Sequence, residues 1–214
     1  MLEIKIFQCN MLAENCYVVS DDSGEAVIID CGALYADERQ AIGKYIADQQ
    51  LTPVRLLCTH GHLDHCFGLA FVHARYGLSP QISTADDFLL SDLSGQASTM
   101  FGMDFAEPTP PPGPSLEADV PICFGHHTLH VLPTPGHSPG SVLFYCKEER
   151  VVFTGDTLFR MGIGRTDLQR GSWADMKHSL ANVVAKLPAD TLAYCGHGPA
   201  TRLGDEQRLN PYLR

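Results

Sequence analysis

Short apolar runs with the two-residue alternation of β-strands open the chain. Three strands are predicted at residues 2–7, 15–20 and 26–30, with a polar turn before the third. Residues 35–51 instead place apolar side chains at helical spacing and stop at Thr52-Pro53, so a helix is predicted there. The chain is therefore expected to begin as a β-meander followed by a helix.

Strand and helix patterns continue along the rest of the chain. Strands are predicted at residues 54–58, 81–84, 125–132, 142–146 and 150–154, and helices at residues 66–76 and 172–187. In the last helix Ser172 is the expected N-cap, and the expected buried side includes Trp173, Met176 and Leu180. The last two strands form a predicted hairpin that delivers Asp156 at its end.

Four residues with metal-binding side chains lie directly after the predicted strand 54–58. They are His60, His62, Asp64 and His65, and strand ends are where α/β proteins place their chemistry. Alternate side chains of an extended segment share a face, so His60 and His62 can reach one ion together. Asp64 and His65 fall where a helical pattern begins, and the change of backbone direction lets them turn toward a second ion. The spacing favours two metals over a histidine-rich surface turn or a set of hydrogen-bonded core histidines.

Three further candidate ligands occur far down the chain, each after a predicted strand and a glycine. His137 lies in a rigid Gly/Pro turn, Asp156 follows an apolar strand, and His197 lies in Tyr194-Cys195-Gly196-His197-Gly198. Glycine permits the unusual backbone angles and the close approach that a ligand-bearing turn needs. These residues are the expected partners of the first motif.

With this set, the chain resembles the metallo-β-lactamase superfamily. Within the superfamily it is similar to the glyoxalase II branch of thioesterases, in the short form that lacks a C-terminal helical domain. The resemblance is carried by His60-x-His62-x-Asp64-His65 with His137, Asp156 and His197, and runs from the first strands to the last turn. It implies an α/β fold, a four-layer αββα sandwich in which two β-sheets lie face to face with helices outside.

The resemblance also implies how the ligands are divided between two ions. His60, His62 and His137 would hold the first ion, Asp64, His65 and His197 the second, and Asp156 would bridge both, with Asp64 and Asp156 as the catalytic carboxylates. The expected cofactors are two divalent metal ions, with zinc expected and iron or manganese as alternatives. Two such ions roughly 3.5–4 Å apart can hold a hydroxide, lower its pKa toward neutrality and polarise a substrate carbonyl.

Three other residues are assigned roles by the same resemblance. Asp30 is expected to lie behind the metal site and orient a ligand histidine, or else simply to end a strand at a glycine turn. Arg165 is the candidate anchor for a substrate carboxylate, because a guanidinium can clamp a carboxylate with two hydrogen bonds. The alternative for Arg165 is a salt bridge to nearby Asp167, and Arg160 is a weaker candidate for the same anchoring role.

The segment at about 86–116 is predicted to be a lid-like insert in a single domain spanning residues 1–214. It combines a region without clear periodicity and a proline-rich stretch, 108–114, that cannot pair as a central strand. Its apolar residues either line the substrate cleft or pack the insert onto the body: Met100, Phe101, Met103 and Phe105. Three extra histidines, His126, His127 and His130, are expected at an edge or in solvent and not at a further metal.

Composition narrows the possible partners and location. The chain has 214 residues, of which 44% are hydrophobic and 19% charged, and its formal net charge is −10. An acidic protein is poorly suited to nucleic acid or an anionic membrane, so neither is expected as a partner. The N-terminal residues lack the features of a signal peptide, and no stretch is long and apolar enough to span a bilayer. Eight cysteines without C-x-x-C spacing are expected to be reduced, mostly buried thiols of a cytoplasmic protein.

The expected function is a metal-dependent thioesterase acting on small thioesters similar to S-lactoylglutathione. The run Gly164-Arg165-Thr166-Asp167-Leu168-Gln169 also resembles persulfide dioxygenases, which would use a single iron held here by His60, His137 and Asp156. The complete second set of ligands argues against that alternative. A non-catalytic metal-binding module is the third possibility, and a complete ligand set argues against lost catalysis.

Overall fold

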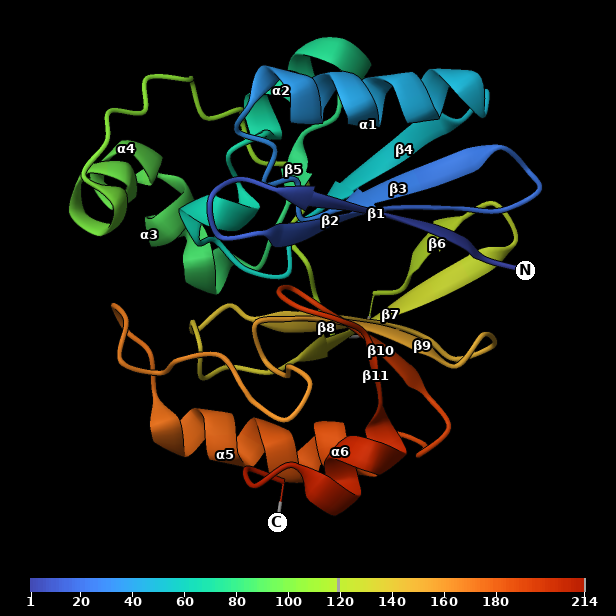
Figure 1. The fold of residues 1–214 in the computed structure, drawn as a ribbon, viewed down its shortest axis with the longest axis vertical. Helices are drawn as coiled ribbons and strands as arrows, with labels where there is room; N and C mark the ends of the chain where they lie inside the picture. Colours follow the sequence, from blue (N-terminus) through green and yellow to red (C-terminus); the bar gives the residue numbers. More distant parts are fainter. Residues whose placement is uncertain (119, 214) are drawn as a thin grey trace.

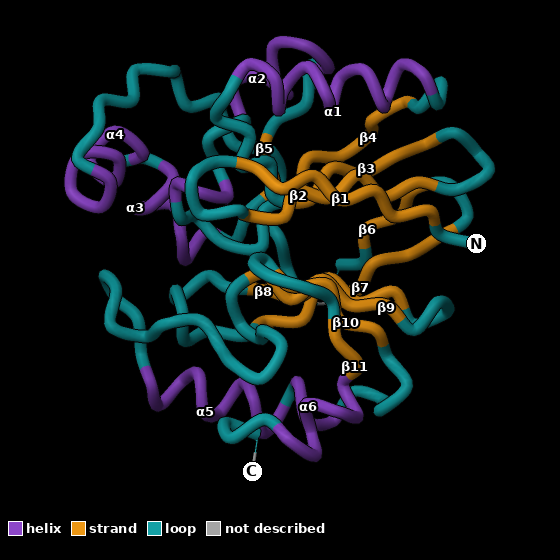
Figure 2. The backbone as a smooth tube through the Cα atoms, viewed as in Figure 1, coloured by secondary structure: helices purple, strands orange, loops and turns teal. Residues whose placement is uncertain are grey.

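Two β-sheets lie face to face in this protein, and helices cover their outer faces (Figure 1). The computed structural model describes residues 1–118 and 120–213. Helices α1 (Ala36–Asp48) and α2 (Leu69–Tyr76) lie over one sheet, and helices α5 (Trp173–Asn182) and α6 (Leu203–Leu209) lie over the other (Figure 2). This is the α/β four-layer αββα sandwich expected from the sequence, and that prediction is confirmed.

The first sheet is built from the N-terminal meander and two parallel additions. Its order is β1-β2-β3-β4-β5, and its strands are β1 (Glu3–Cys9), β2 (Glu14–Ser20), β3 (Glu25–Ile29), β4 (Thr52–Leu57) and β5 (Pro80–Gln81). The first three strands pair antiparallel, whereas β4 and β5 join parallel after crossovers. Strand β2 is buried along its whole length, because helices cover one face of the sheet and the second sheet covers the other.

The second sheet has six strands in the order β11-β10-β9-β8-β7-β6. They are β6 (Ile122–Phe124), β7 (His127–Pro133), β8 (Val142–Cys146), β9 (Val151–Gly155), β10 (Leu192–Cys195) and β11 (Thr201–Arg202). Strands β8 and β9 form the predicted hairpin, with Phe144 opposite Phe153. Strand β10 then pairs parallel to β9, so the chain leaves both strands at the same edge of the sheet.

Apolar side chains form three layers between these elements. One cluster, with Val18, Ile28 and Phe67, fills the space between the first sheet and its helices. A second, with Val27 and Phe144, lies between the two sheets, and a third packs the second sheet against α5 and α6. Burial of these layers supplies the main driving force that holds the loops at the sheet ends in fixed positions.

Several predicted boundaries are wrong in detail. The helix predicted at 172–187 ends as α5 at Asn182, and a short 3₁₀ turn, η4 (Val184–Lys186), follows it. Trp173, expected on the buried side, is 48% exposed, because it lies in the first turn and contacts Tyr212 at the surface. The strand predicted at 81–84 is shorter in the structure and spans Pro80–Gln81.

The helix predicted from residue 66 begins later, at Leu69. The 3₁₀ turn η1 (Leu63–His65) precedes this helix.

The insert between the two halves is mostly short helical turns at one end of the sandwich (Figure 1). Its turns are η2 (Thr84–Asp86), α3 (Asp87–Leu90), α4 (Leu93–Gln96) and the π-helical turn η3 (Ala97–Phe101). The Phe101 and Phe105 rings pack on Phe67, with ring centroids 5.8 and 5.4 Å apart, and Met103 joins the same cluster. Of the four apolar candidates, Met100 lines the cleft over the ligand cluster described below, and that this cleft binds substrate stays a prediction. That residues 86–116 act as a lid stays a prediction.

The position of His127 differs from the expectation of an edge or solvent location. His126 is exposed, but His127 is buried with both ring nitrogens engaged. Its Nδ1 lies 2.8 Å from an Asp21 carboxylate oxygen and its Nε2 lies 3.0 Å from a Glu149 carboxylate oxygen. The same Asp21 accepts hydrogen bonds from the backbone N–H groups of Ser23 and His126. This cluster ties three turns together at the end of the molecule away from the metal-ligand motif.

Replacing Asp21 with asparagine is expected to lower the free energy of unfolding at pH 7 by about 1–3 kcal/mol. Burial alone would raise the pKa of Asp21, but hydrogen bonds from Ser23, His126 and His127 lower that pKa well below its usual value. A lowered folded-state pKa stabilises the protein above the unfolded-state pKa of about 3.9, and this contribution is lost as the pH falls further. Urea unfolding at pH 7 and at low pH should show the difference from wild type shrinking on acidification. Exposed Asp22→Asn is the matched control, and an equal effect of both variants would contradict the prediction.

Candidate metal centre

Loops from the ends of both sheets bring the seven candidate ligands together. His60, His62, Asp64 and His65 follow β4, His137 lies in the turn between β7 and β8, Asp156 directly follows β9, and His197 follows β10. The backbone before Asp156 turns at Gly155, where φ is +47° and a side chain would collide with Thr59. Because the carboxyl ends of parallel strands share one edge of a sheet, β9 and β10 place Asp156 and His197 side by side.

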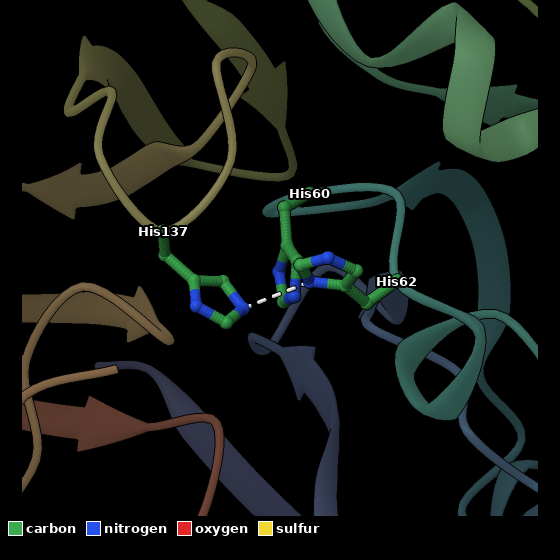
Figure 3. A group of neighbouring side chains, drawn as sticks. All are labelled: His60, His62 and His137. Carbon is green, nitrogen blue, oxygen red and sulfur yellow. Dashed lines mark hydrogen bonds between the residues drawn. The ribbon is translucent and has the colours of Figure 1, made fainter. Parts of the chain in front are cut away.

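One group of ligand atoms consists of three histidines. His60, His62 and His137 are all buried, and their candidate ligand nitrogens lie within 4.8 Å of one another. Figure 3 shows the three rings converging from two separate loops, with His62 Nδ1 2.8 Å from His137 Nε2. The set matches the predicted first ion site.

A second group contains Asp64, His65 and His197, again with ligand atoms within 4.8 Å of one another. His197 Nε2 lies 3.2 Å from Asp64 Oδ2 and 3.3 Å from His65 Nε2. Asp64 and His65 reach this group because η1 turns the chain after His62, as the sequence suggested. The set matches the predicted second ion site.

Asp156 lies between the two groups. One carboxylate oxygen is 3.3 Å from His65 Nε2, and the other is 3.5 Å from His137 Nε2 and 3.6 Å from His197 Nε2. A single carboxylate therefore faces nitrogens of both groups, as the predicted bridging role requires. The structure thus places all seven side chains as predicted, and their roles as metal ligands remain proposals.

The unsatisfied polar atoms of the site fit metal ions. Among buried side chains of the described residues, His60 Nε2 and Asp156 Oδ1 have no hydrogen-bond partner. Buried polar atoms normally have one, and both of these atoms point into the cluster. Three imidazoles on one side and a carboxylate with two imidazoles on the other are donor sets that suit zinc or iron.

The electrostatics of the two groups differ. Burial lowers the pKa of His60, and burial with the neighbouring His137 lowers the pKa of His62 to about 3. These imidazoles are therefore neutral, the form that binds metal. Burial alone would lower the pKa of His65 too, but Asp156 and Asp64 raise it well above its usual value. Burial alone would raise the pKa of Asp156, but His65 lowers it, so the carboxylate carries the charge that a divalent ion would neutralise.

Oxygen atoms behind the rings fix the orientation of four histidines. His65 Nδ1 donates to Asp30 Oδ2 at 3.1 Å, so the expected contact between Asp30 and a ligand histidine is present in the structure. Asp30 also accepts hydrogen bonds from the backbone N–H and the hydroxyl of Thr59, at 2.7 and 2.6 Å. The other partners are neutral: the Thr59 hydroxyl for His60, the Arg165 carbonyl for His137 and the Leu12 carbonyl for His197. Such contacts select the tautomer and raise the basicity of the ring.

Sequence reasoning missed two side chains that hold the ligand loops in place. Buried Asp86 accepts hydrogen bonds from the Gly61 and Gly140 backbone N–H groups, at 3.0 and 2.7 Å, and from the Ser138 hydroxyl. It therefore joins the His60–His62 segment to the turn that carries His137. Gln96 accepts from the Leu63 N–H and donates to the Gly61 carbonyl. Neither residue belongs to a local motif, so no sequence signal identified them.

A cleft of about 230 Å³ opens over the ligand cluster. Apolar side chains flank the ligands, and Arg165 lies at its margin; the flanking residues are Leu12, Met100, Phe159 and Leu168. The exposed Arg165 guanidinium makes two hydrogen bonds to Asp167, at 2.7 and 2.8 Å, which is the alternative reading of this residue. Arg160 lines a separate hollow of about 670 Å³ near Arg202 and does not line the cleft. The guanidinium carbon of Arg170 lies 4.1 Å from the centroid of the Phe88 ring, and this cation–π contact connects the loop that carries Arg165 to the insert.

An αββα sandwich with a cluster of histidine and aspartate side chains at its sheet edge is typical of metallohydrolases. The family model described as "Metallo-beta-lactamase superfamily" matches residues 10–197. The chain belongs to this superfamily, whose fold it shares.

Two proteins that are similar to this chain over almost its whole length are named as hydrolases. The chain is 37% identical over 198 residues to "Probable metallo-hydrolase YqgX" of Bacillus subtilis, covering 92% of this chain and 90% of that protein. It is 33% identical over 223 residues to "Hydroxyacylglutathione hydrolase GloC" of Haemophilus influenzae, covering 99% of this chain and 98% of that protein. These relatives support a metal-dependent hydrolase.

Two solved structures are similar over almost the whole chain. "BLEG-1 B3 metallo-beta-lactamase" has a TM-score of 0.90 and 34% identity, covering 99% of each chain. "TTHA1623 in a di-iron-bound form" has a TM-score of 0.84 and 35% identity, covering 98% of this chain and 100% of that one. Among the described residues, no helix is both long and apolar enough to cross a bilayer.

Proposed function

We propose that this protein is a thioesterase of the glyoxalase II type that hydrolyses small thioesters similar to S-lactoylglutathione with two divalent metal ions. The observation that supports this proposal most directly is that Asp156 lies between two complete ligand groups beneath one cleft. The similarity to a hydroxyacylglutathione hydrolase over 98% of that protein's length supports the thioester class. Eight free cysteines support a cytoplasmic location.

The proposed ligands are those of the two groups. His60, His62 and His137 would hold one ion, Asp64, His65 and His197 the other, and Asp156 would contact both. Zinc is the expected metal, with iron or manganese as alternatives. When bound, such ions supply an activated water and polarise a carbonyl, so the chain needs no serine or cysteine nucleophile.

The chain's own residues would position the substrate and control its surroundings. Leu12, Phe159 and Met100 present apolar surface at the cleft, which would exclude bulk water from the thioester. Arg165 lies at the margin, where its guanidinium could exchange Asp167 for a substrate carboxylate. His137 would stay oriented throughout, because its Nδ1 donates to the Arg165 carbonyl and not to the side chain.

Metal analysis combined with a substrate panel tests the proposal. Purified protein is assayed with S-lactoylglutathione, thioesters of neutral carriers, a lactone, a phosphoester and a β-lactam, beside elemental analysis of the same sample. Metal-dependent hydrolysis of thioesters above the other classes is expected. Full metal occupancy without hydrolysis of any substrate would contradict the proposal and favour the non-catalytic module.

A persulfide dioxygenase with one iron is the second function raised by the sequence. It would use His60, His137 and Asp156 and leave the Asp64–His65–His197 group without a role, although that group is as tightly assembled as the first. An oxygen-uptake assay with glutathione persulfide separates the two functions, since a hydrolase consumes no oxygen.

Replacing Arg165 with alanine is expected to raise KM several-fold for anionic thioesters and to leave kcat nearly unchanged. The reason is that an anchor for a remote carboxylate contributes equally to the ground state and the transition state. Steady-state kinetics with anionic and neutral carriers of the same acyl group measure the effect, and the neutral carrier should show none. Asp167→Asn is the control, because it removes the carboxylate charge that competes for the guanidinium and should not raise KM. An unchanged KM in Arg165→Ala would show that the anchor lies elsewhere.

A further inference from the structure

Asn10 lies in the loop between β1 and β2, directly after Cys9, the last residue of β1. Its backbone is in the left-handed region, with a φ of +52°, which asparagine adopts more readily than most residues with a side chain. Its backbone N–H donates to Glu38 Oε1 at 2.6 Å, and Glu38 Oε2 accepts from two backbone N–H groups just before α1. The backbone of Asn10 is therefore anchored to the helix layer, which holds its side chain in place.

The side-chain nitrogen of Asn10 binds two backbone carbonyl groups. Nδ2 donates to the Asp64 carbonyl oxygen at 2.8 Å and to the Gly32 carbonyl oxygen at 2.9 Å, so both of its hydrogens are used. This close approach requires glycine at position 32, because a Cβ there would lie 2.1 Å from the Asp64 carbonyl oxygen and 2.7 Å from Asn10 Nδ2. Asn10 therefore fastens the backbone of Asp64, a proposed ligand of the second ion, to the turn after β3.

The side-chain oxygen of Asn10 holds the loop itself. Oδ1 accepts from the Leu12 backbone N–H at 2.9 Å. The Leu12 carbonyl in turn accepts from His197 Nδ1 at 3.2 Å, and Leu12 also lines the cleft. One amide group thus contacts Asp64 directly and His197 through Leu12, and both belong to the second ligand group.

The backbone of the His197 loop is held by a different residue. Asn15 donates from its backbone and its side chain to carbonyl groups on both sides of His197. These bonds fix the course of the loop, whereas the Leu12 carbonyl selects the tautomer of the His197 ring. The contribution of Asn10 is therefore to the Asp64 backbone and to the position of Leu12.

We propose that Asn10 is a positioning residue that fixes two parts of one site: the Asp64 and His197 side of the ligand cluster, and the apolar cleft wall at Leu12. The inference rests on the proposed two-ion thioesterase. The hydrogen bonds of the Asn10 side chain reach Gly32, Asp64 and Leu12 and none of the three-histidine group. The second ion should therefore depend on Asn10, and the first should not.

Zinc titration of metal-free Asn10→Gly against a competing chelator tests the effect on the ions. Glycine keeps the left-handed backbone and removes all three side-chain hydrogen bonds. The second zinc ion is expected to bind about 10-fold more weakly or worse, while the first binds as in wild type. Wild-type affinity for both ions would overturn the inference, and so would equal weakening of both.

Amide hydrogen exchange of Leu12, followed by NMR in the metal-free protein, tests the effect on the cleft wall. Exchange is expected to be several-fold faster in Asn10→Gly than in wild type, because the N–H loses its acceptor. Asn10→Asp keeps an oxygen that can accept from Leu12 and tolerates the left-handed backbone, so exchange should stay slow. Equal exchange rates in the two variants would show that the Asn10 oxygen does not hold the loop.

Gln50→Gly is the matched control. Gln50 is also an amide residue in the left-handed region, with a φ of +56°, but it is exposed and precedes β4, whereas the ligands follow that strand. Its replacement should leave both zinc affinities and the exchange of Leu12 unchanged. Weakened zinc binding in Gln50→Gly would show that glycine at such a position acts by loosening the fold and would overturn the inference.

The zinc and exchange measurements do not depend on catalysis. Two zinc ions bound by a wild-type protein that hydrolyses no thioester would contradict the proposed function and leave the role of Asn10 intact. A wild-type protein that binds one zinc ion at saturation would overturn the inference, even if it is an active thioesterase.

Discussion

Replacing Asp156 with alanine is expected to abolish binding of both metal ions and to lower hydrolysis more than roughly 100-fold, since loss of outer partners alone costs about 10–100-fold. Asp156 faces both ligand groups, with oxygens 3.3 Å from His65 Nε2 and 3.5 Å from His137 Nε2. Without it, five imidazoles converge with only Asp64 to offset the charge of two ions. Elemental analysis and the thioesterase assay measure the two losses together.

His62→Ala is the comparison variant for that experiment, because it is expected to lose one metal ion and not both. His62 belongs to the three-histidine group alone, so its loss should remove one ion and leave the Asp64–His65–His197 group able to bind the other. Retention of two ions by Asp156→Ala, or equal metal loss in the two variants, would contradict a bridging position. Circular dichroism of both variants shows whether the fold is retained.

Replacing Asp86 with alanine is expected to lower the free energy of unfolding by about 3 kcal/mol or more, because three buried donors lose their acceptor at roughly 1–3 kcal/mol each. The donors are the Gly61 and Gly140 backbone N–H groups and the Ser138 hydroxyl. These contacts hold the two loops that carry the three-histidine group, so metal affinity should fall as well. Thermal unfolding of the metal-free protein should show a lower Tm, by about 6–12 °C for a chain of this size.

Asp87→Ala is the matched control for Asp86→Ala. Asp87 is the next residue along the chain and is exposed, so its removal should change Tm little. If both variants lower Tm equally, the effect belongs to the helical turn and not to the hydrogen bonds of Asp86. If Asp86→Ala unfolds as wild type, the joining role assigned to this carboxylate is wrong.

The predicted elements succeeded where interactions are local. The strands β1 to β3 and the hairpin of β8 and β9 were predicted from short apolar runs and the polar turns between them, which are properties of neighbouring residues. Predictions failed where a distant contact decided the outcome. Trp173 has the helical spacing of a buried residue yet lies at the surface beside Tyr212. His127 belongs to an edge hairpin yet is buried, because Asp21 and Glu149 approach it from other turns.

The candidate metal centre likewise contains residues that the sequence identifies and residues that only the structure reveals. Its seven proposed ligands could be named in advance, since four of them lie within six positions and the others follow strands beside glycines. Of the side chains that support them, Asp30 could be named in advance but Asp86 could not, because Asp86 contacts Ser138 across 52 positions.

The sequence by itself therefore determined the class of elements, the ligand types and the family resemblance, because strand periodicity and ligand spacing are properties of neighbouring residues. Only the tertiary structure decided which oxygens lie behind the imidazoles of His60, His137 and His197, that Asp156 faces both ligand groups, and that Arg165 is held by Asp167. The physical reason is that hydrogen bonds act over about 3 Å in space, whatever the separation along the chain.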